Sequence, residues 1–257
     1  MATVVFLHAH PDDEALATGG TMARMADEGH RVVLVVATSG EEGEPVPGVL
    51  AAGESLGDRR VAELAEAAEI LGVERLVNLG YRDSGMAGDD ANDHPDCFWQ
   101  ADVDAAAGHL AAALADESPD VVVVYDPDGG YGHPDHIQVH RVGHRWAEAA
   151  GIDRVRWVTM NRDAIRASIE AALADEDSGS DEGMLELRRE FAESESFGMP
   201  DAEITHAIDV SAVIDRKRAA IAAHASQIGP ESFFLAMPDE QFAMAFGTEW
   251  FVDPGSP

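Results

Sequence analysis

Two short clusters hold the residues that could do chemistry, and the first is HAHPDDEA at His8–Ala15. It places two histidines, two aspartates and a glutamate directly after the apolar run Val4–Leu7. Carboxylates packed so closely repel one another unless protons or a cation hold them together. Because histidine nitrogens and carboxylate oxygens are ligands that zinc accepts, the cluster predicts a metal site.

The second cluster, YDPDGGYGHPDHIQVHR at Tyr125–Arg141, also follows an apolar run, Val121–Val124. In open parallel sheets, ligands bind beyond the carboxyl ends of the strands. We therefore expect both clusters at the same edge of one sheet, where they can form a single site.

The spacing of the residues favours particular ligands. If the chain turns helical after Pro11, His10 and Asp13 can point to the same side, whereas Asp12 projects differently. His136 can supply a third ligand from the second cluster. Two histidines and one carboxylate, with an open position for water, make up a catalytic zinc site. The same donors also accept iron(II), cobalt or manganese.

This ligand set implies a class of reaction. A zinc ion lowers the pKa of its water toward ~7 and polarises a substrate carbonyl. Asp12, which is not needed as a ligand, can then take the proton of the water. His133 can protonate the leaving nitrogen or stabilise the oxyanion. The sequence thus indicates metal-assisted hydrolysis of an amide or an ester.

Short apolar runs alternate with alanine-rich amphipathic stretches, a pattern typical of βα units around a parallel sheet. The expected strands are Thr3–Leu7, Arg31–Ala37, Arg75–Leu79, Val121–Tyr125 and Val155–Thr159. The expected helices are Gly19–Glu28, Arg59–Leu71, Val103–Ala115 and Asp135–Ala149. The fold class predicted is α/β, a Rossmann-like three-layer sandwich with a mostly parallel central sheet.

Residues 40–58 and 80–100 are rich in Gly, Pro, Asp and Glu, as functional loops are. Further along, an acidic loop is expected at Asp175–Gly183 and an extra strand at Ile204–Val210, with helices at Leu185–Ser196 and Val213–Ser226. The length suits a single domain over residues 1–257. In it, residues 1–160 form the core with the metal site, and residues 161–257 lie near the substrate.

Composition excludes several partners. The net charge of −32, from 49 acidic and 17 basic residues, makes nucleic acid a poor partner, because phosphates would be repelled. Cys97 is the only cysteine, so a metal ion would have to be bound by histidine and aspartate side chains. Neither a membrane span nor a secretory leader is recognisable, and we expect a cytoplasmic protein. A homo-oligomer is not excluded.

The acid excess, with Lys217 as the only lysine, suggests a halophilic protein that works in a salt-rich cytoplasm. The alternative is an acidic proteome that prefers arginine to lysine.

Together, HAHPDDE and GGYGHPDH resemble the paired signatures of the PIG-L/LmbE-like zinc de-N-acetylases, which remove acetyl groups from N-acetylglucosamine-containing conjugates. The segments SGEEGE (Ser39–Glu44), RDSGM (Arg82–Met86) and AHASQI (Ala223–Ile228) are similar to one branch of that family. That branch contains the mycothiol-biosynthesis deacetylase and the mycothiol S-conjugate amidase. The resemblance is good over residues 3–145 and patchy beyond.

Carried over to this chain, the resemblance implies Zn2+ on His10, Asp13 and His136. It implies that Asp12 is the general base and that His133 is the electrophilic or acid partner.

The resemblance further implies that Tyr131 assists carbonyl polarisation and that Arg60 and Asp83 hold an amino-sugar conjugate. His8 is expected to pack beside the site. His140 and His144 follow at helical spacing and could enlarge the metal site, although second-layer or surface roles are the commoner outcome.

Three alternatives to a de-N-acetylase remain open. The first is an amidase of the same mechanism that cleaves thiol S-conjugates. The second is a non-catalytic module that binds sugars or nucleotides. The third is a metal-dependent phosphoesterase, which would usually require a second metal about 3.5–4 Å from the first.

Overall fold

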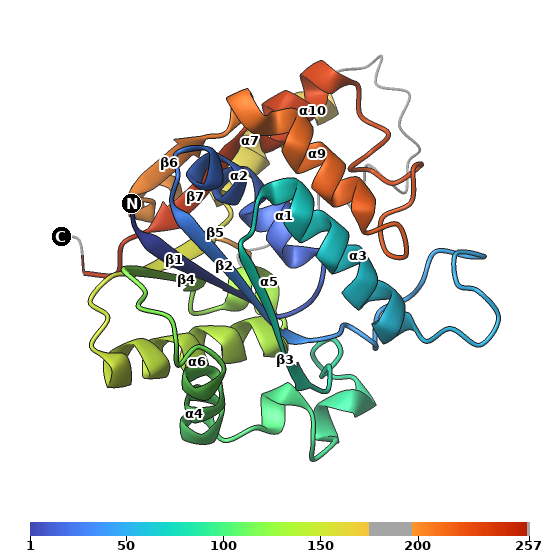
Figure 1. Ribbon diagram of the computed structural model, residues 1–257. Helices are drawn as coiled ribbons and strands as arrows, with labels where there is room; N and C mark the ends of the chain where they lie inside the picture. The colour runs from blue at the N-terminus through green and yellow to red at the C-terminus, as the bar shows by residue number, and fades with distance from the viewer. Residues whose placement is uncertain (175–196, 256–257) are drawn as a thin grey trace.

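The five predicted parallel strands are contiguous and form one side of a seven-stranded mixed sheet. In the computed structural model, which describes residues 1–174 and 197–255, the strand order is β3-β2-β1-β4-β5-β7-β6 (Figure 1). The parallel strands are β1 (Thr3–His8), β2 (Arg31–Thr38), β3 (Arg75–Tyr81), β4 (Val121–Tyr125) and β5 (Val155–Thr159). The predicted loop Asp175–Gly183 and helix Leu185–Ser196 lie outside the described residues.

Two C-terminal strands extend the sheet beyond β5. Strand β7 (Thr248–Val252) pairs antiparallel with β5, and β6 (His206–Asp209) pairs antiparallel with β7. The extra strand expected at Ile204–Val210 is therefore present in shorter form. Sequence analysis assigned no element to β7, whose position depends on pairing with distant residues. The expectation of a mostly parallel sheet is confirmed.

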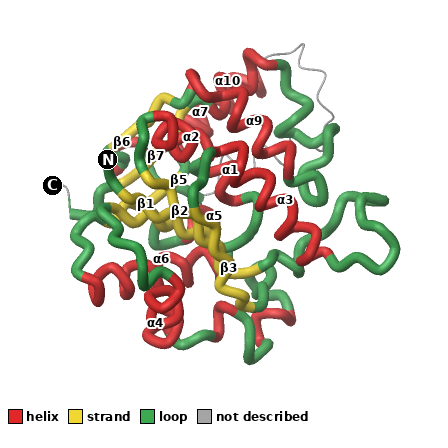
Figure 2. Tube along the Cα trace, viewed as in Figure 1, coloured by secondary structure: helices red, strands yellow, loops and turns green. Residues whose placement is uncertain are grey.

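Helices cover both faces of the sheet (Figures 1 and 2). On one face, neighbouring helices contact one another: α1 (Asp13–Ala17), α2 (Gly19–Asp27), α3 (Leu56–Leu71) and α9 (Ile214–Ala223). On the other face, α4 (Val103–Ala113) packs against α6 (Pro134–Ala150). Because both faces are covered, strand residues such as Val32–Ala37 are completely buried, and the predicted three-layer α/β architecture is confirmed.

The remaining elements are short or were not predicted. Helices α7 (Arg162–Ala174) and α10 (Asp239–Phe246) fall where sequence analysis assigned no element. A four-residue helix, α5 (Gly129–Gly132), precedes α6. Four 3-10 turns complete the described elements: η1 (Asp90–Asp93), η2 (Phe98–Gln100), η3 (Asp201–Glu203) and η4 (Ser211–Val213).

Helix α3 begins at Leu56, three residues before the predicted start. The reason is a cap: the Ser55 hydroxyl accepts the backbone N–H of Asp58 at 3.1 Å. From the second turn of α3, Arg60 contacts the amino-terminal cluster at the Pro11 carbonyl oxygen and the Asp12 carboxylate. Helix α6 begins at Pro134 with His133 as its N-cap residue, and this places a predicted catalytic side chain at the helix start.

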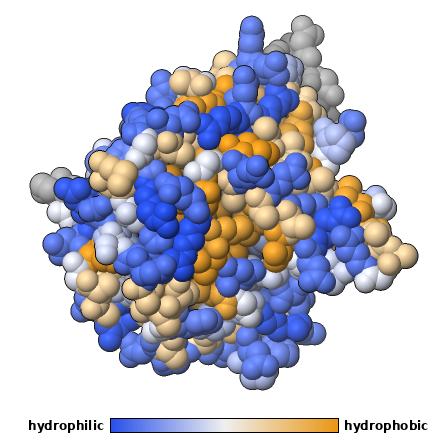
Figure 3. All heavy atoms as spheres, viewed as in Figure 1, coloured by the Kyte–Doolittle hydropathy of each residue, from blue (hydrophilic) through white to orange (hydrophobic). Residues whose placement is uncertain are grey.

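Polar residues cover most of the molecular face shown in Figure 3, and an apolar strip lies near its middle. Within the described residues, every helix is too short or too polar to cross a bilayer.

Candidate active site

The two sequence clusters meet at the carboxyl edge of the sheet. Strands β1 and β4 are neighbours, with Phe6 paired to Val123, so the segments that follow them emerge side by side. One ring nitrogen from each of His10, His133 and His136 lies within 4.8 Å of the other two. The carboxylate oxygen Oδ2 of Asp13 lies 3.3 Å from His10 Nδ1 and 3.3 Å from His136 Nε2. A cluster of histidine nitrogens and carboxylate oxygens results.

His136 carries an atom that lacks a hydrogen-bond partner. Its Nδ1 lies 3.1 Å from the carbonyl oxygen of Gly129, so Nδ1 carries the proton and donates it. Its Nε2 then has a free lone pair, and this atom is buried without a hydrogen-bond partner in the described part of the chain. A buried acceptor left unpaired is costly, which a metal ion at this position would remedy.

The local backbone fixes the His136 ring. Gly129 has φ 66°, and a Cβ atom there would lie 2.7 Å from the Cβ of His136. Only glycine allows this approach. On the other side, Tyr125 stacks on the ring with a centroid distance of 4.1 Å and an interplanar angle of 9°. The ring is therefore held in one orientation.

His10 is oriented by a carboxylate that sequence analysis did not single out. Its Nε2 lies 3.1 Å from Oδ2 of Asp135, which is completely buried and also accepts the backbone N–H of Ser84 at 3.0 Å. A carboxylate behind the imidazole directs the Nδ1 lone pair toward Asp13 and is the usual support of a metal-bound histidine. Its place between the histidines of HPDH was the only sequence signal for Asp135.

The charges of the cluster favour a cation at its centre. Burial alone would lower the pKa of His10, but hydrogen bonds to Asp13, Asp135 and Asp83 outweigh it and raise that pKa well above its usual value. Burial would likewise raise the pKa of Asp13, yet the charges of His136 and His10 hold it well below its usual range. Because the donors are imidazole nitrogens and a carboxylate oxygen, the residues present fit zinc.

Asp12 has a strained backbone. Its φ of 108° is the only positive φ of a non-glycine residue in the described ranges, and such a conformation costs about 1–3 kcal/mol. Burial raises the pKa of its carboxyl group to about 6, although the charge of Arg60 opposes the shift. Strain at a residue beside a candidate metal site suggests that its conformation serves function.

Arg60 supports the Asp12 segment. Its guanidinium donates to the carbonyl oxygens of Gly40 at 2.6 Å and Pro11 at 2.5 Å. It also forms an ion pair with Asp12 at 3.1 Å. Only Nε of this buried side chain lacks a partner within the described ranges. The predicted contact of Arg60 with substrate stays a prediction, and the structure adds a role in holding Asp12.

His133 lies at the start of α6 as a neutral ring. Burial, together with the charges of His10 and His136, lowers its pKa to about 3. Its Nδ1 accepts the backbone N–H of Asp135 at 3.2 Å, so the remaining proton is on Nε2. His133 can therefore donate a hydrogen bond from Nε2 while it is uncharged.

Tyr131 and Asp83 border the same cluster. The Tyr131 ring is 44% exposed, and its centroid lies 5.0 Å from that of His136. It stands between Gly130 and Gly132, whose φ values are 77° and 90°. Asp83 is buried, accepts the backbone N–H of Gly85 at 2.9 Å, and lies 3.4 Å from His10 Nε2. The roles assigned to both residues from the resemblance stay predictions.

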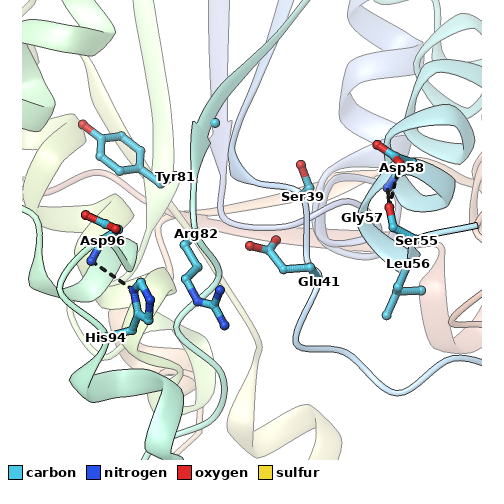
Figure 4. Close-up of a pocket in the computed structure, with 11 residues that line it drawn as sticks. Ser39, Glu41, Ser55, Leu56, Gly57, Asp58, Tyr81, Arg82, His94 and Asp96 are labelled. Carbon is cyan, nitrogen blue, oxygen red and sulfur yellow. Dashed lines mark hydrogen bonds between the residues drawn. The ribbon is translucent and has the colours of Figure 1, made fainter.

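A groove opens beside the segment that holds Asp83 (Figure 4). Its volume is about 610 Å³, and the loop after β2 and the start of α3 face the segment after β3 across it. In Figure 4, Glu41 and Arg82 extend into the space between these walls. One oxygen of Glu41 accepts the backbone N–H of Asp83 at 3.1 Å, which links the groove to the candidate metal site. The two loops expected to be functional therefore line a cavity.

The other histidines lie outside the candidate metal groups of the described residues. His8 is completely buried between the Tyr125 hydroxyl at 3.0 Å and the Thr18 hydroxyl at 2.8 Å, in agreement with the expected packing role. The Nδ1 of His140 lies 2.9 Å from the Tyr125 carbonyl oxygen, and His144 accepts the indole N–H of Trp157 at 2.7 Å. Both therefore have structural partners.

An α/β sheet with a His/Asp cluster at its carboxyl edge and a general-base candidate beside it is the architecture of a metal-dependent hydrolase. Comparisons with known proteins agree. The family model described as GlcNAc-PI de-N-acetylase, PIG-L, matches residues 5–147, which is more than half of the chain. The chain therefore belongs to the PIG-L family of de-N-acetylases and is a hydrolase of that type.

Two relatives carry the name 1D-myo-inositol 2-acetamido-2-deoxy-alpha-D-glucopyranoside deacetylase. The protein of Acidothermus cellulolyticus is 44% identical over 97% of this chain and 88% of its own length. The protein of Thermobifida fusca is 44% identical over 95% of this chain and 87% of its own length. The similarity thus extends well past residue 145, where the sequence patterns alone looked patchy.

Among solved structures, the N,N'-diacetylchitobiose deacetylase of Pyrococcus horikoshii is similar, with a TM-score of 0.56 and 22% identity. The alignment covers 97% of this chain and 82% of that one. At this level of identity, the likeness supports the fold.

Proposed function

We propose that this protein is a zinc-dependent deacetylase that hydrolyses the acetamide of 1D-myo-inositol 2-acetamido-2-deoxy-α-D-glucopyranoside to acetate and the free amine. The substrate is the one for which the relatives with 44% identity are named. The observation that carries the proposal is the buried, unpartnered Nε2 of His136, which faces Asp13 at 3.3 Å. It indicates a metal at the place where the reaction requires one.

In the proposed site, His10, Asp13 and His136 would hold the metal. When bound, zinc would act as a Lewis acid that polarises the amide carbonyl and lowers the pKa of water. His133 could also reach the metal, because its nitrogen belongs to the same group. We assign it to the substrate instead, because the Nε2 proton fixed by its cap hydrogen bond makes it a donor.

The residues around the metal carry the proton transfers. Asp12 accepts a proton from the attacking water as the new C–O bond forms. His133 donates a hydrogen bond from Nε2 to the carbonyl oxygen, where negative charge develops. Asp12 then returns the proton to the leaving nitrogen as the C–N bond breaks, so that acetate and the amine are released. Tyr131, which is partly exposed beside His136, assists the polarisation of the carbonyl.

The groove beside the Asp83 segment, with a volume of about 610 Å³, is large enough for more than an acetamide. Asp83 joins the metal site to this groove, because it lies 3.4 Å from His10 Nε2 and its backbone N–H bonds to Glu41. In the proposal, Arg60 and Asp83 hold the glucosamine ring. The polar lining of the groove, with Ser39, Glu41 and Arg82, suits the hydroxyl groups of an inositol.

The test is a direct assay of the purified zinc-loaded protein. Release of acetate and of a primary amine is measured with the inositol glycoside, with free N-acetylglucosamine and with a cysteinyl S-conjugate. We expect the glycoside to be turned over most efficiently. Preferred cleavage of the S-conjugate would favour the amidase, and no turnover of any of the three would refute the proposal.

Two variants test the assigned roles. Asp12→Ala should retain zinc and lose most turnover, because only the base is removed. His136→Ala should lose zinc itself. The opposite pattern, with zinc lost in Asp12→Ala and retained in His136→Ala, would contradict the assignment. Metal analysis of the same samples should show about one zinc per chain, whereas two would revive the phosphoesterase.

A further inference from the structure

A buried histidine from the carboxyl-terminal part of the chain stands behind Asp12. His224 and Glu14 are both 0% exposed, and His224 Nε2 lies 2.6 Å from Oε1 of Glu14. The other oxygen of Glu14, Oε2, accepts the backbone N–H of Asp12 at 2.9 Å. This series of contacts joins the end of α9 to the one strained non-glycine residue of the described chain.

We propose that His224 and Glu14 are positioning residues that hold the Asp12 backbone in the conformation required for proton transfer. The inference rests on the proposed function, in which Asp12 is the base. His224 belongs to the AHASQI segment, which the sequence linked to the family by resemblance alone, and sequence analysis assigned no role to Glu14. The structure gives a role to each of these two residues.

The bond to Glu14 is directed and charged. The second ring nitrogen of His224, Nδ1, is buried without a hydrogen-bond partner in the described part of the chain. Among the described residues, the ring of His224 therefore forms its hydrogen bond with Glu14. Burial would lower the pKa of His224, but the charge of Glu14 outweighs it and raises that pKa. An ionised carboxylate binds an N–H group more strongly than a neutral acceptor does.

Asp12 needs support at two points. Arg60 contacts its carboxylate, and Glu14 contacts its backbone N–H. Without the second contact, the positive φ can relax toward an ordinary value, and the carboxylate moves with it. A displacement of about 1 Å in a catalytic group can cost about 100-fold in rate. The metal ligands need not move, because Asp13 and His136 have contacts of their own.

The same helix provides a matched control. Lys217 lies on α9, the helix that ends just before His224, and is 1% exposed; its Nζ lies 2.6 Å from Oε1 of Glu249. Glu249 in turn accepts the backbone N–H groups of Gly20 and Thr21, both at 2.8 Å. This second arrangement also runs from a buried cation through a carboxylate to the backbone, but it ends at the start of α2. Its loss should affect stability without reaching Asp12.

The experiment compares His224→Leu, His224→Gln and Lys217→Met in the zinc-loaded enzyme. We expect His224→Leu to lower kcat by on the order of 10- to 100-fold. Its KM and its zinc content should stay within about 2-fold of wild type. His224→Gln should recover most of the loss, because its amide can donate to Glu14. Lys217→Met should lower the thermal midpoint while kcat stays within about 2-fold of wild type.

A second measurement does not depend on activity. In the metal-free protein, the Asp12 amide proton should exchange with solvent faster in His224→Leu than in wild type or Lys217→Met. If His224→Leu does not fold, His224→Asn, whose amide is too short to reach Glu14, replaces it in the comparison.

The outcomes separate the two proposals. If kcat of the His224 variant is unchanged, or falls no more than that of Lys217→Met, the positioning role is overturned. If Asp12→Ala itself keeps normal turnover, the base assignment of the proposed function is wrong, and this inference fails with it. An inactive Asp12→Ala beside a fully active His224→Leu overturns the positioning role alone.

Discussion

Replacing Asp135 by asparagine would test the metal site with little change of shape. Oδ2 of Asp135 bonds to His10 Nε2 at 3.1 Å and to the Ser84 backbone N–H at 3.0 Å, and Oδ1 accepts the Ser84 hydroxyl. In Asp135→Asn, the amide oxygen can keep the first two bonds while its NH2 group donates to the Ser84 hydroxyl oxygen. The variant therefore removes the negative charge behind His10 and keeps a hydrogen bond at each of the three contacts, although the one to the Ser84 hydroxyl reverses its direction.

The size of the effect follows from that charge. The carboxylate raises the basicity of His10 and fixes its ring, and loss of such a partner typically weakens metal affinity or activity about 10- to 100-fold. This corresponds to about 1.4–2.7 kcal/mol of zinc binding. We expect the Kd for zinc to rise by this factor in a competition titration against a fluorescent chelator. The thermal midpoint of the metal-free protein should change little.

Glu63→Gln is the matched control. Glu63 is also buried and accepts both the backbone N–H of Ser226 at 2.9 Å and its hydroxyl at 2.6 Å. The same chemical change is thus made at a carboxylate whose bonds go to a serine and not to a histidine. If Asp135→Asn binds zinc as tightly as wild type, or if Glu63→Gln weakens zinc binding equally, the proposed role of Asp135 is refuted.

Three further results are expected. Gly40→Ala should lower kcat/KM about 10-fold or more, because its Cβ would lie 2.4 Å from Arg60 Cζ and displace that side chain from Asp12. Gly48→Ala should leave kcat/KM nearly unchanged, because Gly48 has a similar positive φ but open space around it. Equal losses of kcat/KM in the two variants would contradict the role given to Arg60. Burial and the charge of His140 lower the pKa of His144 to about 4. The native state therefore resists protonation, so the stability that neutral His144 contributes is complete above pH 6.5 and is lost as the pH falls toward 4. In urea unfolding, the free energy of unfolding should depend less steeply on pH between 4 and 6.5 for His144→Gln than for wild type. An unchanged pH dependence would show that His144 does not contribute to it. Finally, the net charge of −32 predicts that the unfolding temperature rises from low to multimolar KCl, and a flat response would discard a halophilic origin.

The central fold could be predicted because its signals are local. The apolar runs such as Val121–Val124 identify strands covered on both faces, and the helices between them force parallel pairing. Helix boundaries were less predictable: Ser55 starts α3 early through a cap that the amphipathic pattern does not contain. Strand β7 could not be foreseen, because Thr248–Val252 forms an element only by pairing with β5 and β6.

The sequence by itself determined the chemistry. Two histidines and two aspartates in HAHPDDEA, with a second pair of histidines in HPDH, specify the donors, because residue type decides what can bind a metal or move a proton. The order of the strands then brings the two clusters to one edge. Residue type is a property that the chain carries locally, and the alternation of strands and helices predicts the parallel sheet whose carboxyl edge both clusters share.

Only the tertiary structure decided which partners hold those donors in place. Asp135 supports His10 from 125 residues away, and His224 supports Glu14 from 210 residues away. Neither pairing has a signature in the sequence, because a buried charge can be matched by any residue that folding brings near it. The orientation of the ring of His10 and the strained backbone of Asp12 therefore depend on the packed molecule.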